Sequence, residues 1–154
     1  MKLSDSLDEK LILPKLKSTT KSTVLREFTA LIKKNGHIKN MEDVYDALME
    51  REKQTSTGIG RGIAIPHCKL KCIDRVIVAL GRSKKGIDYK SIDSQPVNIF
   101  FVILSPVSMD DQHIKTLSSI SKLLKHIHVN NAIMCAKTAR EIMDIIIKEE
   151  EILI

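Results

Sequence analysis

The run "VNIFFVIL" at residues 97–104 decides the fold class of this chain. Its side chains are β-branched, aromatic or aliphatic with one interruption, which is typical of a strand buried on both faces. The run "RVIVAL" at 75–80 has the same character and predicts a neighbouring strand. "IAI" at 63–65 predicts a third strand, which ends at Pro66 because proline cannot donate a hydrogen bond to a sheet ladder. The middle of the chain is therefore predicted to be a β-sheet.

Helical patterns lie on both sides of this sheet along the sequence. Ser22 and Asn40 are the expected N-caps of two helices before it. "SMDD" at 108–111 and "TARE" at 138–141 resemble capping boxes and predict two helices after it. The order helix, sheet, helix predicts an α/β fold. We expect a single domain over residues 1–154, with a central mixed β-sheet flanked by helices on both faces.

Composition excludes several classes of function. The net charge is +6, but there is no Trp and there are only two Tyr and three Phe, so few aromatic rings could stack on bases. The excess of lysine is spread along the chain, which predicts a solvated surface and no nucleic-acid partner. No apolar run approaches the ~20 residues of a membrane helix, and no signal peptide is expected. The sparse cysteines Cys68, Cys72 and Cys135 indicate free thiols in a reducing cytoplasm.

The segment "TSTGIGRGIAIPHCK" at 55–69 holds the candidate site. Its three glycines lack the GxGxxG spacing of a dinucleotide site, and no Gly-Lys-Ser/Thr follows as in a P-loop. His67, Cys68 and Cys72 are too few for a structural zinc site, so no metal is predicted. A Cys68–His67 catalytic pair is disfavoured, because neighbouring side chains on a strand point to opposite faces.

His67 acting alone remains as the reactive group. Imidazole can be a nucleophile and can carry a phosphoryl group, whose oxygens need hydrogen-bond donors and cations. On spacing alone, a single histidine after a strand is more often structural. The donors expected from the preceding loop are the hydroxyl and backbone N–H groups of Thr55, Ser56, Thr57 and Gly58. Arg51 adds a cation, and the role of Arg61 stays open.

Two segments then show a family resemblance. "REKQTSTGIGRGIAIPHCK" at 51–69 resembles the active-site segment of phosphotransferase-system enzyme IIA domains of the fructose/mannitol/nitrogen-regulatory superfamily. "DQHIKTLSSISKLL" at 111–124 resembles the helix that carries the second histidine of that family. The resemblance runs over nearly the whole chain, and both motifs are most similar to those of the nitrogen-type members.

The resemblance implies a phosphoryl carrier that needs no cofactor. His67 would accept the phosphoryl group from the phosphocarrier HPr, as tele-phosphohistidine. His113 would stabilise that group, and Arg51 would add electrostatic stabilisation. Cys68 departs from the family, because many relatives have Gly or Ala there, and it would add oxidative sensitivity near the site.

The fate of the phosphoryl group stays open at this point. The 154 residues contain no IIB or IIC segment, which favours a nitrogen-type regulator that binds a transporter or a kinase. The alternative is a fructose/mannitol-type IIA that passes the group to a separate IIB component. A third hypothesis is a binding module that is no longer phosphorylated. In each case we expect a bacterial, cytoplasmic protein.

Overall fold

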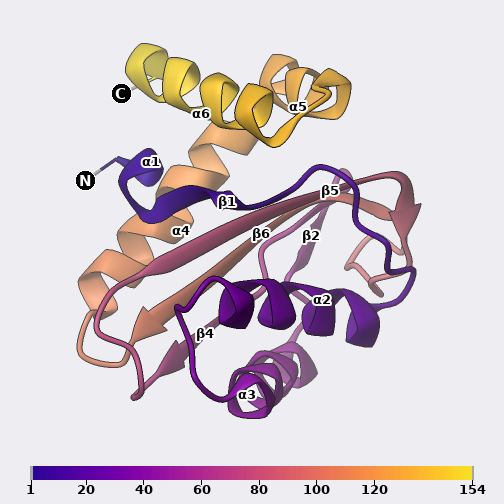
Figure 1. Cartoon of the computed structure of the whole chain (residues 1–154). Coiled ribbons are helices and arrows are strands. Elements are labelled where there is room, and N and C mark those ends of the chain that lie inside the picture. Colours follow the sequence, from indigo (N-terminus) through magenta and orange to yellow (C-terminus); the bar gives the residue numbers. More distant parts are fainter. Residues whose placement is uncertain (1, 154) are drawn as a thin grey trace.

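The computed structural model describes residues 2–153, and a six-stranded mixed sheet lies at its centre (Figure 1). The strands are β1 (Leu7–Leu13), β2 (Gly58–Gly60), β3 (Ile63–Ala64), β4 (His67–Leu70), β5 (Ile77–Ile87) and β6 (Val97–Pro106). The order is β1-β5-β6-β3-β2, and β4 also pairs with β6. The pairing of β5 with β6 is antiparallel, whereas β3 and β4 run parallel to β6. The predicted central sheet is confirmed; β1, β2 and β4 were not predicted.

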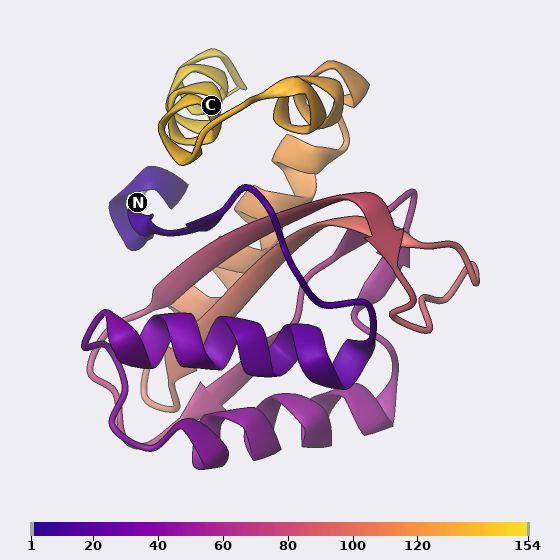
Figure 2. The ribbon, with the colours of Figure 1, turned by 45° about the vertical axis from the view of Figure 1, so that its right-hand side comes forward.

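Helices cover both faces of this sheet, as the sequence predicted (Figures 1 and 2). They are α1 (Leu3–Ser6), α2 (Lys21–Lys34), α3 (Met41–Gln54), α4 (Asp110–Leu124), α5 (Ile127–Cys135) and α6 (Ala139–Leu153). The helices α2 and α3 pack on one face, and α4, α5 and α6 pack on the other. Helices α1 and α5 were not predicted.

The unbroken apolar runs are explained by two hydrophobic cores. On β5, Val78 and Leu80 belong to the core under α4–α6, whereas Ile77 and Ala79 belong to the core over α2 and α3. Side chains alternate between the faces of a strand, so a strand covered on both faces needs apolar residues at every position. Strand β6 alternates between the two cores in the same way.

Two of the predicted caps need correction. The N-cap of α2 is Thr20, whose hydroxyl accepts a hydrogen bond from the N–H of Thr23, so Ser22 already lies inside the helix. At the start of α4, Met109 occupies the N-cap position, and Ser108 does not cap because the helix begins one residue later than predicted.

The other two predicted caps are confirmed. The side-chain oxygen of Asn40 accepts hydrogen bonds from the N–H groups of Glu42 and Asp43, at 3.1 and 3.2 Å. The hydroxyl of Thr138 accepts from the N–H of Glu141 at 3.1 Å. Each satisfies N–H groups that have no partner within their helix.

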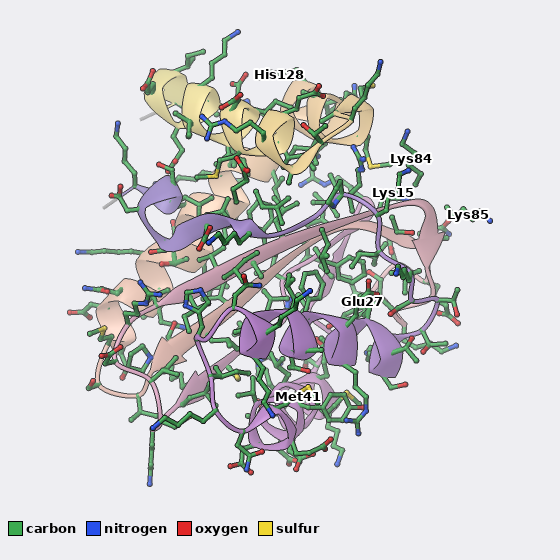
Figure 3. The ribbon with its side chains drawn as sticks, in the orientation of Figure 1. Lys15, Glu27, Met41, Lys84, Lys85 and His128 are labelled. Atoms are coloured by element: carbon green, nitrogen blue, oxygen red, sulfur yellow. The ribbon has the colours of Figure 1, made fainter. Side chains whose placement is uncertain are left out.

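Charged side chains are spread over the surface of the molecule (Figure 3). Lys15, Lys84 and Lys85 are exposed and point outward where the β5–β6 hairpin turns. Over residues 2–153, no helix is both long enough and apolar enough to span a membrane.

Candidate functional site

A cavity of about 670 Å³ lies beside β4, where helices from the two opposite faces of the sheet meet. Strand β4 supplies His67 and Lys69, helix α3 supplies Arg51, and helix α4 supplies His113 and Leu117. The three residues that the sequence placed in one site are therefore brought together, although 62 positions separate the first from the last.

The ring of His67 is held in one tautomer. Its Nδ1 lies 2.7 Å from the carbonyl oxygen of Ile65. A carbonyl can only accept, so Nδ1 carries the hydrogen and Nε2 keeps its lone pair. Burial lowers the pKa of His67, and the charges of Arg51 and Lys69 lower it further. The Ile65 hydrogen bond and the Glu52 carboxylate oppose this shift. His67 is therefore neutral at pH 7, with Nε2 free to act as a nucleophile.

His113 lies deeper in the same cavity. His113 is only 5% exposed, and its Nδ1 lies 2.7 Å from the hydroxyl oxygen of Ser105. The ring centroids of His113 and His67 are 5.4 Å apart, with an angle of 53° between the rings. Burial lowers the pKa of His113 to about 4, and the charge that His67 carries when it is protonated and the charge of Lys69 lower it further. The second imidazole is therefore also neutral at pH 7.

Two cations border the cavity. Arg51 lies in the last turn of α3, and its guanidinium donates to the carbonyl of Thr55 at 2.9 Å. The ammonium of Lys69 lies 2.8 Å from the carboxylate of Asp110. Sequence reasoning missed Lys69, although a residue two positions after His67 on a strand shares its face. It also missed Ser105, which only the register of β4 against β6 brings near the site.

The four loop residues predicted to bind the phosphoryl group do not line this cavity. The hydroxyl of Thr55 donates to the carbonyl of Gln54. The hydroxyl oxygen of Ser56 accepts from the N–H of Gly58 at 3.1 Å. Thr57 is buried, and its hydroxyl contacts Glu52. These polar groups are therefore already engaged within the loop and its neighbours.

A buried carboxylate fixes this loop to the rest of the domain. Glu52 accepts hydrogen bonds from the N–H and the hydroxyl of Thr57 and from the hydroxyl of Tyr89, the last at 2.8 Å. It also pairs with the ammonium of Lys21 at 3.0 Å. Because Glu52 follows Arg51 directly, the network holds both the end of α3 and the loop beyond it.

The glycines of "GIGRG" shape the chain next to this loop. Gly60 and Gly62 have φ angles of +97° and +78°, in the left-handed region that glycine adopts without strain. A Cβ atom on Gly58 would lie 2.9 Å from the Cα of Ser91, so only glycine fits there. The glycine pattern therefore serves the β2–β3 turn and close packing. Arg61 lies in this turn, outside the lining of the cavity, and its N–H donates to Asp93 at 3.1 Å.

Cys68 points to the opposite side of β4 from His67, as the alternation of a strand predicted. It is 7% exposed and belongs to the core over α2 and α3. Burial raises the pKa of the Cys68 thiol to about 12. Because oxidation starts from the thiolate, this geometry argues against the oxidative sensitivity expected from the sequence. Among residues 2–153, no cluster of three His, Cys, Asp or Glu side chains is placed to hold a metal ion.

Comparison with known families gives one match over most of the chain. The model described as "Phosphoenolpyruvate-dependent sugar phosphotransferase system, EIIA 2" matches residues 5–149. This range includes His67, His113 and Arg51.

Similar proteins carry two kinds of name. The chain is 35% identical over 146 residues to the fructose-specific EIIABC component from Bacillus subtilis. The aligned residues cover 95% of this chain and 23% of that protein. The chain is 31% identical over 148 residues to a nitrogen regulatory protein from Bradyrhizobium diazoefficiens, and the aligned residues cover 95% of each protein. The chain therefore spans less than a quarter of the first relative and nearly all of the second.

Solved structures have the same fold. The nitrogen regulatory protein IIA-Ntr from Neisseria meningitidis matches with a TM-score of 0.87 and 24% identity, over 94% of this chain and 98% of that one. Mannitol enzyme IIA from Escherichia coli, in its complex with phosphorylated mannitol enzyme IIB, matches with a TM-score of 0.76 and 20% identity, over 90% and 95%. The predicted fold class is confirmed.

Proposed function

The chain belongs to the EIIA 2 family of the phosphoenolpyruvate-dependent sugar phosphotransferase system, and we propose that it carries a phosphoryl group on Nε2 of His67. One observation carries this assignment. The carbonyl of Ile65 holds Nδ1 of His67 at 2.7 Å, which leaves Nε2 as the reactive nitrogen in a cavity that also contains His113 and Arg51.

The transfer needs only the groups of this cavity and a phosphorylated donor. The lone pair of Nε2 attacks the phosphorus of a donor phosphohistidine in line, and the P–N bond of the donor breaks. The donor ring carries a proton on its other nitrogen, so it leaves as a neutral imidazole. The ring of His67 gains positive charge during the attack. The carbonyl of Ile65 stabilises that charge because it accepts a hydrogen bond from Nδ1–H. The proton stays on Nδ1 throughout the transfer.

His113 and the two cations stabilise the transferred group. When Ser105 donates its hydroxyl hydrogen to Nδ1 of His113, the hydrogen of the neutral ring lies on Nε2 and can be donated to a phosphoryl oxygen. Arg51 and Lys69 supply positive charge at the edge of the cavity. The loop residues then act by fixing the shape of the wall beside Arg51, because the hydroxyl groups of Thr55, Ser56 and Thr57 and the N–H of Gly58 are engaged elsewhere.

The donor is an HPr-type phosphocarrier, which places the reaction in the cytoplasm. Two acceptors fit the relatives. A regulated transporter or kinase fits the likeness to the nitrogen regulatory protein. A IIB component fits the likeness to the fructose-specific EIIABC component and to the mannitol IIA–IIB complex. Incubating the phosphorylated protein with a fructose-type IIB distinguishes the two acceptors, because only a sugar-type IIA would pass its phosphoryl group to the IIB component quickly.

The carrier role is tested by transfer from phosphoenolpyruvate through enzyme I and HPr. We expect one phosphoryl adduct on the wild type by intact mass at alkaline pH, where phosphohistidine survives, and none on His67→Ala. His128→Ala is the matched control, since His128 is exposed and lies outside the cavity; it should be labelled like the wild type. Equal labelling of His67→Ala would overturn the proposal.

A further inference from the structure

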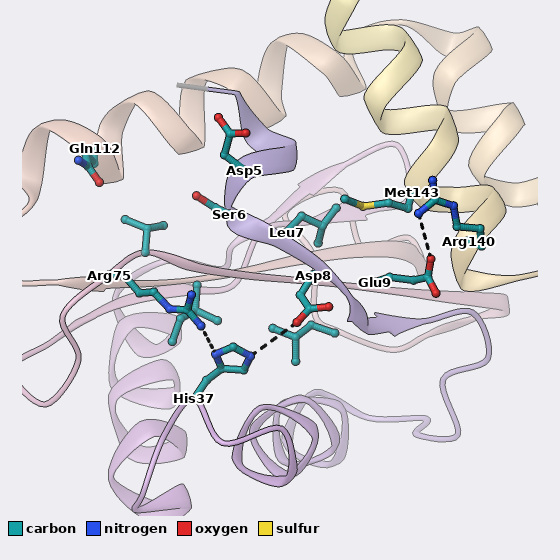
Figure 4. Close-up of a pocket in the computed structure, with 13 residues that line it drawn as sticks. Asp5, Ser6, Leu7, Asp8, Glu9, His37, Arg75, Gln112, Arg140 and Met143 are labelled. Atoms are coloured by element: carbon teal, nitrogen blue, oxygen red, sulfur yellow. Dashed lines mark hydrogen bonds and ion pairs between the residues drawn. The ribbon is translucent and has the colours of Figure 1, made fainter.

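The first turn of helix α4 lies between two cavities. Gln112 lines the cavity beside β1, of about 590 Å³, where Arg140 pairs with Glu9 (Figure 4). The next residue, His113, lines the cavity that contains His67. A charged residue in this turn is therefore close enough to the site of His67 to act on it.

One carboxylate of this turn holds Lys69. The ammonium of Lys69 lies 2.8 Å from Oδ1 of Asp110, and this hydrogen bond lowers the pKa of Asp110. Lys69 lines the cavity together with His67 and His113, whereas Asp110 lies outside the lining. In the unmodified protein, the ion pair therefore draws the ammonium toward a carboxylate that is not part of the cavity.

Lys69 is also placed to reach a phosphoryl group on His67. Residues two apart on a strand share a face, so Lys69 and His67 lie on the same side of β4. Burial lowers the pKa of both His67 and His113, and the charge of Lys69 lowers both further, so the ammonium already acts on the two imidazoles. The side chain of lysine is flexible, and its ammonium has three donors that can turn to a new acceptor.

A phosphoryl group on His67 and the carboxylate of Asp110 compete for this ammonium. The phosphoryl group carries about two negative charges and three acceptor oxygens, whereas the carboxylate carries one charge. The side chains of Lys69 and Asp110 are 44% and 62% exposed, and ion pairs this exposed are weak. The ammonium therefore moves to the phosphoryl group, but the lost contact with Asp110 offsets part of the gain.

We propose that Asp110 weakens the hold of this protein on its phosphoryl group by competing for Lys69. Asp110 acts through Lys69 and does not touch the phosphoryl group, so it is a positioning residue. Lys69 leaves Asp110 when His67 is phosphorylated and returns to it when the group departs, and this return favours transfer to the acceptor. This role of Asp110 rests on the phosphorylation of His67 proposed above.

The test is the equilibrium of phosphoryl transfer between HPr and this protein, read by intact mass at alkaline pH. Asp110→Asn releases Lys69, so the equilibrium constant for phosphorylation of His67 should rise by about threefold or more. Lys69→Gln should lower the same constant by about threefold or more, because the phosphoryl group loses a cation.

Two matched comparisons isolate the contact between Asp110 and Lys69. Asp111→Asn removes the other carboxylate in the first turn of α4, which forms no ion pair within residues 2–153, so the constant should stay within about twofold of the wild-type value. In a Lys69→Gln background, Asp110→Asn should raise the constant less than it does in the wild type, because no ammonium is left to release. Asp110 and Asp111 are exposed, and circular dichroism should show the wild-type fold for each variant.

The outcomes separate the role of Asp110 from the carrier role of His67. If the wild type takes up no phosphoryl group, both roles are wrong. If the wild type is phosphorylated but Asp110→Asn has the same equilibrium constant, only the role of Asp110 is overturned. An equal rise with and without Lys69 would also overturn it, because the carboxylate would then repel the phosphoryl group directly.

Discussion

The substitution Glu52→Gln tests whether the buried carboxylate holds the loop beyond Arg51. Glutamine has nearly the same shape, so the change removes charge without leaving a cavity. It removes the ion pair with Lys21, at 3.0 Å in the structure. It also turns one acceptor oxygen into an NH₂ group among the donors of Thr57, Tyr89 and Lys21.

The expected loss of stability follows from burial. The side chain of Glu52 is 3% exposed, and breaking a fully buried ion pair costs about 3–5 kcal/mol. The side chain of Lys21 is 19% exposed, so its ammonium can recover part of its hydration and the cost falls. A lost hydrogen bond to a charged group, about 1.5–3 kcal/mol, sets the lower end. We expect a free energy of unfolding lower by about 2–4 kcal/mol, and a Tm lower by roughly 4–16 °C.

Urea unfolding followed by circular dichroism measures this difference. Glu50→Gln is the matched control, because Glu50 lies on the same helix with a side chain 74% exposed and pairs loosely with Lys53 at 3.6 Å. The control should change stability by less than about 0.5 kcal/mol. If Glu52→Gln were as stable as Glu50→Gln, the buried network would not anchor the loop, and the stabilising role assigned to Glu52 would be wrong.

Three further predictions follow from other buried groups. Arg82 is 1% exposed and donates to the carbonyls of Pro14, Ile133 and Ala136, so Arg82→Met should lower the free energy of unfolding by about 3 kcal/mol or more, against little change for exposed Lys84→Met in the same urea assay. The pKa of His113 is about 4 in the folded protein against 6.5 as its ordinary value, so the unfolded chain binds more protons between these pH values. The free energy of unfolding should therefore fall as the pH drops from 6.5 to 4. A dependence of this free energy on pH identical to that of His113→Gln would contradict the prediction. Iodoacetamide should modify the exposed Cys72 and Cys135 in the native protein while sparing Cys68 until unfolding, as read from peptide masses. Rapid modification of Cys68 in the native protein would contradict its place in the core over α2 and α3.

The fold was predictable where burial is simple and local. The runs at 75–80 and 97–104 became the two central strands because both faces of each are covered. Strand β1 was missed because its sequence, "LDEKLIL", places three charged residues in succession, and the structure accommodates them in a bulge at the sheet edge. No local pattern announces that bulge, since it depends on how β1 meets β5.

The candidate site was predictable where a local sequence motif carries it, and not where it depends on tertiary contacts. His67 stands out in a local motif, and His113 was assigned through its family likeness; tertiary structure then brings both to one cavity. The packing of α4 on β6 places Ser105 against His113, and the packing of α4 beside β4 brings Asp110 to Lys69, so neither contact has a signal in the sequence. For the glycines, a clear local pattern led to a wrong interpretation. Their pattern suggested a phosphate-binding loop, whereas the φ angles and the close approach of Gly58 to Ser91 assign them to a turn and to packing.

The most direct measurement identifies the phosphorylated nitrogen itself. The protein, labelled with ¹⁵N-histidine, is phosphorylated through enzyme I and HPr, and long-range ¹H–¹⁵N NMR correlates the ring nitrogens with the ring protons. Because Nδ1 of His67 donates to Ile65 at 2.7 Å, the phosphoryl group should appear on Nε2, with Nδ1 still protonated. A phosphoryl group on Nδ1 of His67, or on any other residue, would contradict the assignment of the reactive nitrogen.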